Sequence, residues 1–217
     1  MPGGQNAVFF DFDGTLYYGT AQLNAWCFAG ALEAMGLPPP TEEMIHQSVG
    51  LTFPQIARLM TGREDAASLG RFEEETFLAV PRYIDRFVRP QPEVKDMLAA
   101  LSGEAALAVC SNASPRYLYP MLDALELTGY FAEIWAHHEG ITKAEAISVL
   151  AVRLAAGRIV FVGDRLEDVS AARQAGVKVV GMRNAAYPWE TDGADAAATD
   201  PAGMLKAIRA LLTQAKE

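Results

Sequence analysis

Residues 7–16, with the sequence AVFFDFDGTL, limit what this chain can fold into more than any other stretch. Four apolar residues, 7–10, are followed by Asp11, Phe12, Asp13 and Gly14. Such an apolar run suits a strand buried on both faces of a parallel sheet. Side chains alternate along a strand, so we expect Asp11 and Asp13 on one side and Phe12 on the other. Two such acids can clamp Mg²⁺, and one can attack as a nucleophile while the other moves a proton. An Asp-Gly pair alone is an ordinary turn signal, but its place directly after a buried strand favours the chemical interpretation.

The composition describes a globular protein and limits its partners. Of the 217 residues, 51% are hydrophobic and 21% are charged, which gives no sign of disorder. The net charge of −9 argues against nucleic acid or an anionic membrane as a partner, so an anionic substrate needs a local positive site. No signal-peptide or membrane-spanning pattern is present, and we expect a cytoplasmic monomer or homodimer. Cys27 and Cys110 are expected to be buried free thiols.

Between residues 17 and 88, every periodic segment is helical. Apolar residues recur at helical spacing in the segments 20–35, 41–49, 53–60 and 69–87. Pro81 predicts a kink or a break in the last of these segments. No strand pattern interrupts the region, which therefore predicts an all-helical unit inserted directly after the aspartate turn.

From residue 90 onward, strand and helix patterns alternate. Buried-strand patterns cover residues 105–110, 131–136, 158–162 and 177–182. Helical patterns cover residues 92–101, 121–127, 143–155, 166–176 and 204–212. Together with the first strand, this alternation predicts an α/β fold with a doubly wound parallel sheet of five strands.

Polar residues suited to phosphate and metal chemistry follow three of the predicted strands. They are Asp11 and Asp13 after the first strand, Ser111 and Asn112 after the second, and Asp164 after the fourth. Ligands of open α/β sheets bind beyond the carboxyl ends of the strands. We therefore expect these side chains to share one site.

Two further residues fit the same site. Asp168 lies one helical turn beyond Asp164, so both carboxylates can face the strand ends. Lys143 offers a cation that can help neutralise a phosphoryl group during transfer. Each residue also has an interpretation without a role in the site. Asp168 could simply be an exposed acid at a helix N-terminus, and Lys143 could be a solvated helix residue. Ser111 and Asn112 on their own are also consistent with a simple turn.

These motifs together resemble those of the haloacid dehalogenase-like hydrolase superfamily, and most closely its phosphoglycolate phosphatase-like branch. They are DFDGTL at residues 11–16, Ser111-Asn112, Lys143 and GDRLED at residues 163–168, and they span nearly the whole chain. The resemblance implies a Rossmann-like core domain of residues 1–16 and 89–217 and a helical cap domain of residues 17–88. It also implies a Mg²⁺-dependent phosphatase that acts on a small phosphorylated metabolite, phosphoglycolate-like or a sugar phosphate.

The resemblance also implies roles for single residues. Asp11 is the nucleophile that forms an aspartyl-phosphate, and Asp13 protonates the leaving oxygen and then activates water. Mg²⁺ is held by Asp11, the backbone carbonyl of Asp13, and Asp164. The phosphate is bound by Ser111, Asn112 and Lys143. The site is supported by Asp168 and Thr15.

Some residues separate this chain from other members of the superfamily. Asp13 argues against a dehalogenase or a phosphonatase, because both lack an acid at that position. Mutases of the β-phosphoglucomutase type carry a cap histidine where this chain has Gln22 or Leu23. Tyr18-Gly19 stands where many members of this branch carry an acidic-serine pair, so the resemblance does not extend to the usual hinge contacts.

Alternatives remain open for the function and for several residues. One alternative is a phosphotransferase or mutase, which passes the phosphoryl group of the aspartyl-phosphate to a second hydroxyl group. The other is a non-catalytic phospho-accepting or binding module, because receiver domains also place acids around Mg²⁺. His137 and His138 lie near the end of the third predicted strand, where they can reach the site or remain at the surface. The candidate cap-side contacts to the substrate are Tyr17, Tyr18, Arg58, Arg82 and Arg86.

Overall fold

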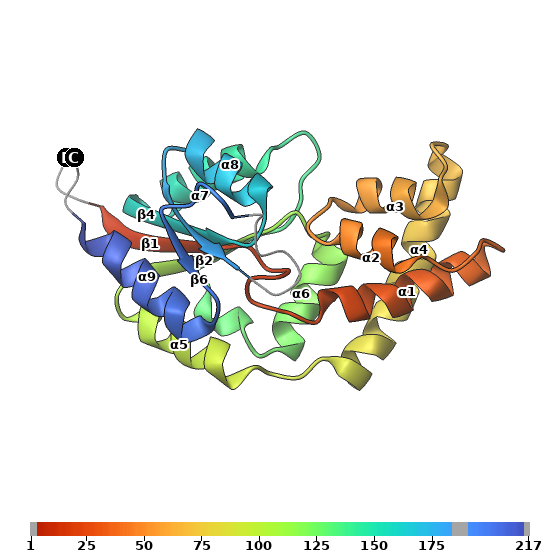
Figure 1. Ribbon diagram of the computed structural model, residues 1–217, viewed down its shortest axis with the longest axis horizontal. Coiled ribbons are helices and arrows are strands. Elements are labelled where there is room, and N and C mark those ends of the chain that lie inside the picture. Colours follow the sequence, from red (N-terminus) through yellow and green to blue (C-terminus); the bar gives the residue numbers. More distant parts are fainter. Residues whose placement is uncertain (1–3, 184–190, 215–217) are drawn as a thin grey trace.

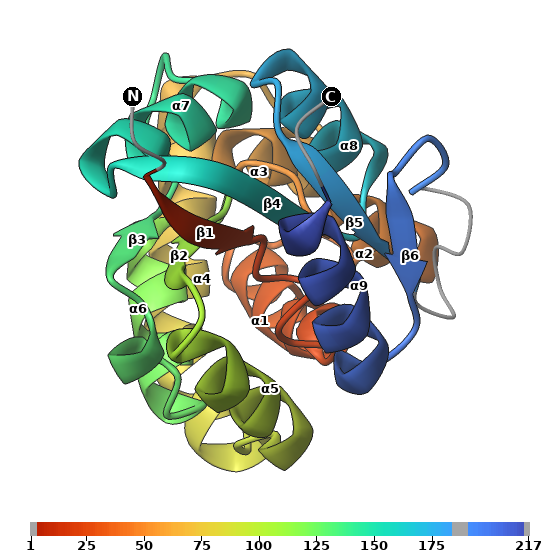
Figure 2. The same ribbon diagram turned by 90° about the vertical axis from the view of Figure 1, so that its left-hand side faces the viewer.

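The computed structural model describes residues 4–183 and 191–214, which form one central sheet with helices around it (Figure 1). The strands of this sheet are all parallel and follow the order β3-β2-β1-β4-β5-β6 (Figure 2). Their bounds are β1 Gln5–Phe10, β2 Ala106–Cys110, β3 Glu133–Trp135, β4 Ala156–Gly163, β5 Lys178–Met182 and β6 Ala196–Ala198. The predicted α/β fold with a parallel sheet is confirmed.

Helices cover both faces of the sheet (Figures 1 and 2). They are α5 Pro92–Ser102, α6 Pro115–Ala124, α7 Lys143–Arg153, α8 Leu166–Gln174 and α9 Pro201–Thr213, with a short 3₁₀ helix at Thr128–Tyr130. Alternate residues of β1 enter the two layers: Phe9 packs with residues of α7 and α8, and Phe10 packs with residues of α5, α6 and α9. Both faces of β1 are therefore buried, as its unbroken apolar run predicts.

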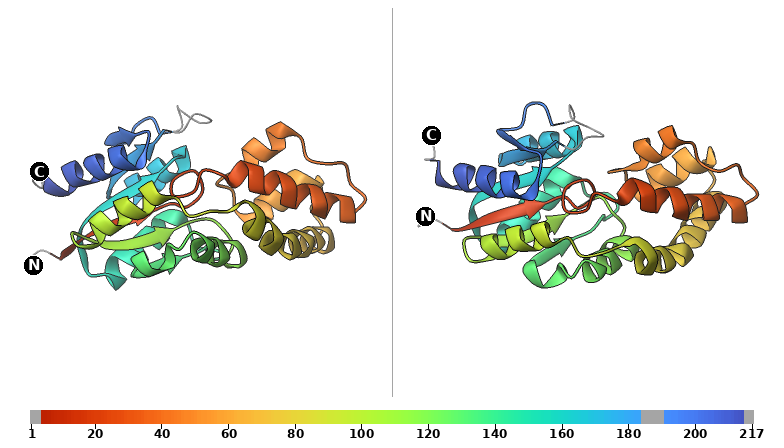
Figure 3. Two further views of the ribbon diagram at one scale, coloured as in Figure 1. Left: turned by 90° about the horizontal axis from the view of Figure 1, so that it is seen from below. Right: turned by 60° about the horizontal axis from the view of Figure 1, so that its bottom comes forward.

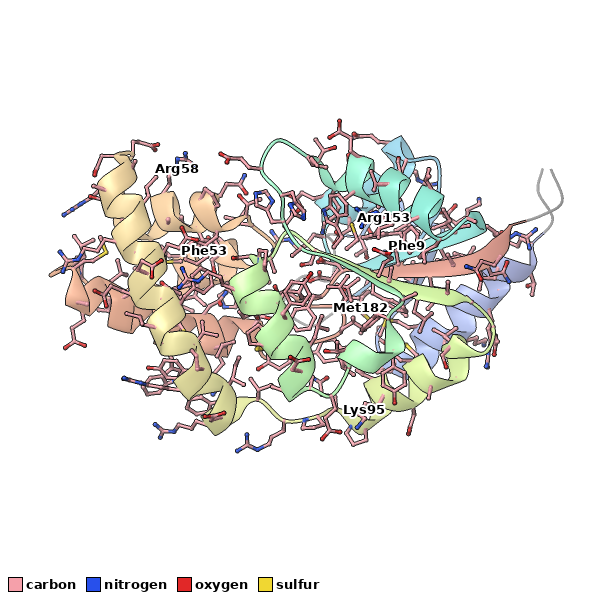
Figure 4. All side chains as sticks on the ribbon, turned by 180° about the vertical axis from the view of Figure 1, so that it is seen from behind. Phe9, Phe53, Arg58, Lys95, Arg153 and Met182 are labelled. Atoms are coloured by element: carbon pink, nitrogen blue, oxygen red, sulfur yellow. The ribbon has the colours of Figure 1, made fainter. Side chains whose placement is uncertain are left out.

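Four helices lie together beyond the carboxyl ends of the strands (Figures 1 and 3). They are α1 Thr20–Ala34, α2 Glu42–Ser48, α3 Phe53–Thr61 and α4 Ala66–Phe87, and we call them the helical lobe. Aromatic rings form its centre, because the ring of Phe53 lies 5.9 Å from that of Phe72 and 4.8 Å from that of Phe77. Figure 4 shows Phe53 among the helices of the lobe and Phe9 at the sheet.

Three differences between the observed and the predicted elements go beyond a shift of a few residues at an end. The helix α4 runs through Pro81 without a break. The helix α6 begins at Pro115, earlier than the predicted segment 121–127, because Ser114 caps it and proline suits the first helical position. The strand β6 was not predicted, since its three alanines carry no strand pattern.

Two expectations from composition can be compared with the structure. Cys27 and Cys110 are both buried and free, which confirms that prediction. Within the described part of the chain, no helix has the length and apolar character needed to cross a membrane.

The strand order determines where a ligand can bind. The strand β1 lies between β2 and β4, so the order of the sheet reverses there, and ligands of such sheets bind in the crevice outside the strand ends at this point. The backbone N–H of Asp11 donates to the carbonyl of Val162 at 2.8 Å, which extends the pairing of β1 with β4 up to the first aspartate. The motif residues therefore stand at the edge of the sheet that faces the helical lobe.

Candidate active site

Asp11 and Lys143 form a buried ion pair at the end of β1. The Nζ atom of Lys143 lies 3.2 Å from Oδ1 of Asp11 and 2.6 Å from Oδ1 of Asp168. Lys143 is the first residue of α7, whose preceding residue Thr142 caps the helix. The three charged side chains are 8% exposed or less. The alternatives of a solvated lysine and an exposed acid are therefore wrong.

Asp168 fixes the turn that carries Asp164. Its Oδ2 atom accepts the backbone N–H groups of Asp164 and Arg165, both at 3.1 Å. The carboxylate packs against Gly163, where an added Cβ would lie 2.4 Å from Cγ of Asp168. Asp168 therefore orients both the neighbouring acid and the lysine, while the glycine leaves room for its carboxylate.

Asp11, Asp164 and Asp168 form an acid cluster with the spacing of metal ligands. One carboxylate oxygen of each lies within 4.8 Å of the others, and all three residues are buried. Gly14 adopts a φ of +80°, and a Cβ there would lie 2.0 Å from Oδ2 of Asp164, so only glycine fits. Apart from its ion pair with Lys143, Oδ1 of Asp11 has no hydrogen-bond partner among the described residues. Three buried acids facing one lysine leave an excess of negative charge, and their hard oxygen atoms suit Mg²⁺.

Asp13 lies outside this cluster and has partners of its own. Its Oδ1 atom accepts a hydrogen bond from the hydroxyl of Thr20 at 2.7 Å and another from the hydroxyl of Tyr117 at 2.8 Å. Thr20 is the first residue of α1, and Tyr117 lies in the first turn of α6. The intervening Phe12 is buried in the apolar core, so the two acids face the site as the alternation predicts.

Ser111 and Asn112 lie beside Lys143. These three residues line one small cavity of about 10 Å³. The Oγ atom of Ser111 accepts the backbone N–H of Ala113 at 3.2 Å. The side chain of Asn112 donates to the carbonyl of Gly50 at 3.3 Å, so it ties the end of β2 to the helical lobe. Thr15, also predicted for the site, is fully buried in the turn after β1, and its hydroxyl has no hydrogen-bond partner among the described residues.

Comparison with known proteins decides the family. A model of the haloacid dehalogenase-like hydrolases matches residues 8–182 of the chain. The chain belongs to this family. The phosphoglycolate phosphatase of Agrobacterium fabrum is 34% identical over 190 residues, which cover 80% of this chain and 78% of that protein. The phosphoglycolate phosphatase of Caulobacter vibrioides is 31% identical over 226 residues, which cover 95% of this chain and 92% of that protein. The crystal structure of a predicted phosphoglycolate phosphatase from Haemophilus somnus shares the fold, with a TM-score of 0.81 and 23% identity. The match covers 94% of this chain and 97% of that one.

In this hydrolase, burial raises the pKa of the acids in the cluster. Burial is the main cause for Asp11, whose pKa rises to about 7 although the charge of Lys143 opposes the rise. Burial, followed by the charges of Asp168 and Asp11, raises the pKa of Asp164 to about 9. These acids lose their protons fully at neutral pH only when further positive charge is present.

The pKa values of Asp13 and Lys143 fit different tasks. Burial raises the pKa of Asp13, while the hydrogen bonds from Thr20 and Tyr117 oppose the rise. A raised pKa suits a carboxyl group that has to donate a proton near neutral pH. Burial by itself lowers the pKa of Lys143, but the charges of Asp11 and other groups outweigh it and raise the pKa above its usual value, so the lysine stays charged.

The sequence did not indicate two residues of this site and indicated others that lie elsewhere. Thr20 and Tyr117 reach Asp13 through tertiary contacts, for which the local sequence carries no signal. Among the candidate cap contacts, Tyr17 is buried against the ring of Phe12. Arg58 pairs with Glu64 at 2.9 Å, at the upper rim of the lobe in Figure 4. The five candidates Tyr17, Tyr18, Arg58, Arg82 and Arg86 are all absent from the lining of the cavity beside Asp13.

Two hollows flank the site of the hydrolase. A groove of about 560 Å³ is lined by Asn112, His137, Lys143 and Arg165 of the core and by the lobe loop at residues 50–52. His137 lines this groove, and both His137 and His138 line the small cavity beside Ser111 and Lys143, although His138 is exposed and also contacts the ring of Trp135. A second, smaller cavity of about 40 Å³ lies between the lobe and α6 and is lined by Asp13.

Proposed function

We propose that this hydrolase is a Mg²⁺-dependent phosphatase that releases inorganic phosphate from a small phosphorylated metabolite. The observation that carries the proposal is the contact of Lys143 with both Asp11 and Asp168 inside the buried acid cluster. A carboxylate nucleophile beside a fixed cation suits phosphoryl transfer, because the cation offsets the charge of the phosphoryl oxygens. The names of the relatives from A. fabrum and C. vibrioides, both phosphoglycolate phosphatases, support the same reaction class.

The acid cluster is the proposed Mg²⁺ site. Asp11 and Asp164 would hold the ion through their carboxylates, together with the backbone carbonyl of Asp13, and Asp168 would keep this arrangement in place. When bound, the ion neutralises the buried acids and stabilises charge on the phosphoryl group. The raised pKa of Asp11 makes this neutralisation important, because a protonated carboxyl group is a poor nucleophile.

In the first half of the reaction, a carboxylate oxygen of Asp11 attacks phosphorus. The bond between phosphorus and the leaving oxygen breaks, and the carboxyl proton of Asp13 moves to that oxygen, so the alcohol departs without charge. Lys143 and Ser111 hold the phosphoryl oxygens during the transfer. The product on the protein is an aspartyl-phosphate at Asp11.

In the second half of the reaction, water attacks the phosphorus of this aspartyl-phosphate. The carboxylate of Asp13 takes a proton from the water, and the bond between phosphorus and the Asp11 oxygen breaks. Inorganic phosphate leaves, Asp11 is again a carboxylate, and Asp13 again carries its proton. Both acids are then ready for another turnover.

We further infer that residues 17–88 act as a cap domain on a core of residues 1–16 and 89–217. The hydrogen bond from Asn112 to Gly50 and the ion pair of Arg116 with Glu74 at 2.6 Å join the two parts next to the site. A movable cover suits this chemistry, since it keeps bulk water away during the first step and admits a water for the second.

The test is the release of inorganic phosphate from a panel of phosphorylated metabolites that includes phosphoglycolate and sugar phosphates. With Mg²⁺ we expect turnover of at least one compound, and a chelator should abolish it. Asp11→Asn should reduce turnover by about a thousandfold or more while the fold persists. Asp96→Asn, which changes an exposed acid of α5, is the matched control and should retain activity. Wild-type turnover by Asp11→Asn would contradict the proposal, and phosphate transfer only to an added hydroxyl acceptor would make the protein a transferase.

A further inference from the structure

The small cavity beside Asp13 has the position of a leaving-group site, an inference that rests on the proposed function. If Asp13 protonates the leaving oxygen, the rest of the leaving group extends from that oxygen past Asp13, away from the phosphoryl group, and the cavity includes Asp13 but not Asp11 or Lys143 in its lining. Asp13, Thr20 and Tyr117 line the cavity from the core and from the start of α1. Side chains from all four helices of the lobe close it, among them Phe28 of α1, Ser48 of α2, Ile56 of α3 and Phe77 of α4.

The size of this cavity selects a short leaving group. Its volume is about 40 Å³, and one water-sized group needs roughly 10–15 Å³ on this measure. About three or four non-hydrogen atoms therefore fit beyond the leaving oxygen. Phe77 and Val80 bound the cavity on the side of α4, so a larger sugar would have to displace buried side chains of the lobe.

The charge around the cavity selects an uncharged leaving group. The described residues that line it include no lysine, arginine or histidine, and Asp13 is itself an acid. Burial raises the pKa of Cys27 to about 12, so this thiol is neutral. The guanidinium of Arg116 lies over the ring of Phe77 at 4.6 Å, but it is already paired with Glu74. A carboxylate in this cavity would be buried beside an acid with no cation among the described lining residues to offset its charge, which is strongly unfavourable.

One polar group in the cavity points to a hydroxyl on the ligand. Thr76 is 2% exposed, and its Oγ1 atom has no hydrogen-bond partner among the described residues. Three other polar side chains of the lobe that line the cavity each make a hydrogen bond: Thr20 donates to Asp13 at 2.7 Å, Asn24 donates to Ser48 at 3.4 Å, and Ser48 donates to the carbonyl of Ile45 at 2.7 Å. Buried hydroxyl groups are nearly always hydrogen-bonded, so Thr76 is the group that a ligand hydroxyl would satisfy.

We propose that the substrate is the phosphate monoester of a short, uncharged alcohol that carries one further hydroxyl group, bound by Thr76. This differs from the substrate named for the relatives, phosphoglycolate, whose leaving group carries a carboxylate. The two classes have nearly the same size, so charge rather than volume separates them.

The first test compares 2-hydroxyethyl phosphate with phosphoglycolate, because a neutral hydroxymethyl group replaces the carboxylate while the number of carbon atoms stays the same. Phosphate release is measured with Mg²⁺, and we expect kcat/KM for 2-hydroxyethyl phosphate to be at least about tenfold higher, since an unpaired buried charge is disfavoured. A higher kcat/KM for phosphoglycolate would overturn the inference while leaving the proposed phosphatase intact. Failure to release phosphate from these esters and from nitrophenyl phosphate would instead contradict the proposed function.

The second test examines the hydroxyl of Thr76. The readout is the ratio of kcat/KM for 2-hydroxyethyl phosphate to that for ethyl phosphate, which lacks the second hydroxyl. We expect Thr76→Val to lower this ratio by at least about fivefold, and Thr76→Ser to keep it. The control is Thr61→Val, which removes a hydroxyl of α3 that donates to the carbonyl of Ala57 and does not line the cavity. An unchanged ratio in a folded Thr76→Val protein, or an equal fall in the control, would overturn the assignment of Thr76.

Discussion

At the scale of single residues, Asp13 is held by two hydroxyl groups that come from different parts of the fold. Thr20 begins the helical lobe and Tyr117 belongs to a core helix, yet both donate to the same carboxylate oxygen. Asp13 can therefore present its other oxygen to a leaving group in a fixed direction. Each donor also opposes the rise in the pKa of Asp13 that burial causes.

Tyr117→Phe removes one of these donors without changing the shape of the ring. We expect kcat/KM for an unactivated alkyl phosphate to fall by about tenfold, because a less well oriented Asp13 delivers its proton less efficiently. The loss should be smaller for nitrophenyl phosphate, whose leaving group needs little protonation. The control is Tyr119→Phe, which changes an exposed tyrosine of the same helix. Equal losses on both substrates would argue that Tyr117 serves only the packing of α6.

The sequence pointed to the acids of the site and to Lys143, but not to the two hydroxyl groups that hold Asp13. Asp11 and Asp164 directly follow strands and Asp13 lies two residues after Asp11, and parallel strands bring their carboxyl ends to one edge. Thr20 and Tyr117 are 97 positions apart along the chain. They meet only because the lobe and α6 pack against each other, and no local pattern reports such a contact.

At the scale of elements, the strand β6 shows what local patterns leave out. Three alanines have little strand preference, and pairing with β5 holds them in the sheet. Asp195 lies directly before this strand and accepts the backbone N–H of Val179 at 2.9 Å and the Nζ of Lys178 at 3.0 Å. The longer buried strands were predictable because their apolar runs are unbroken, whereas this edge depends on one side chain and its tertiary partners.

Asp195→Asn should weaken the attachment of β6. Burial favours the neutral acid, but the hydrogen bond from Val179 and the charges of Lys178 and Arg173 outweigh it and lower the pKa of Asp195 below its usual value of 3.8. The ionised form therefore stabilises the fold above about pH 4, and this contribution is lost as the pH falls through the lowered pKa. We expect the substitution to reduce the free energy of unfolding by about 1 kcal/mol at pH 7, and the difference to shrink below pH 4.

The measurement is urea unfolding of the wild-type protein and of Asp195→Asn at pH 7 and at pH 3. Asp192→Asn serves as the control, because this exposed acid pairs only with Arg183 among the contacts described for it. It should change the free energy of unfolding by less than about 0.5 kcal/mol. If Asp195→Asn lowers the free energy of unfolding at pH 3 as much as at pH 7, the charge of Asp195 is not the cause of the lower stability.

At the scale of the whole molecule, the three buried acids carry more negative charge than Lys143 offsets, so we expect the proposed Mg²⁺ to stabilise the fold. The pKa of Asp11 is about 7 and that of Asp164 about 9 in the metal-free fold, both above the usual value of 3.8. A raised pKa means that the folded state binds more protons than the unfolded state. The stability of the metal-free protein should therefore fall as the pH rises from about 4 through these values.

Mg²⁺ should reverse this loss of stability, because it binds the ionised acids. We expect the increase in Tm caused by Mg²⁺ to be larger at pH 9 than at pH 5.5, with thermal unfolding followed in chelator and in excess Mg²⁺ at both values. Asp164→Asn should lose most of this increase, whereas Asp96→Asn should retain it. An increase in Tm that is the same at both pH values would contradict a site built from these acids.

The central claim is that Asp11 carries the phosphoryl group between the two steps, and trapping that intermediate tests it most directly. Asp13→Asn should slow the attack of water, so incubation with nitrophenyl phosphate and Mg²⁺ should let the aspartyl-phosphate accumulate. Acid quenching followed by borohydride reduction converts an aspartyl-phosphate to homoserine, which peptide mass spectrometry can locate. We predict homoserine at position 11 only when substrate and Mg²⁺ were both present. Homoserine at another aspartate, or its absence at position 11 while nitrophenol is released in a burst, would contradict the account.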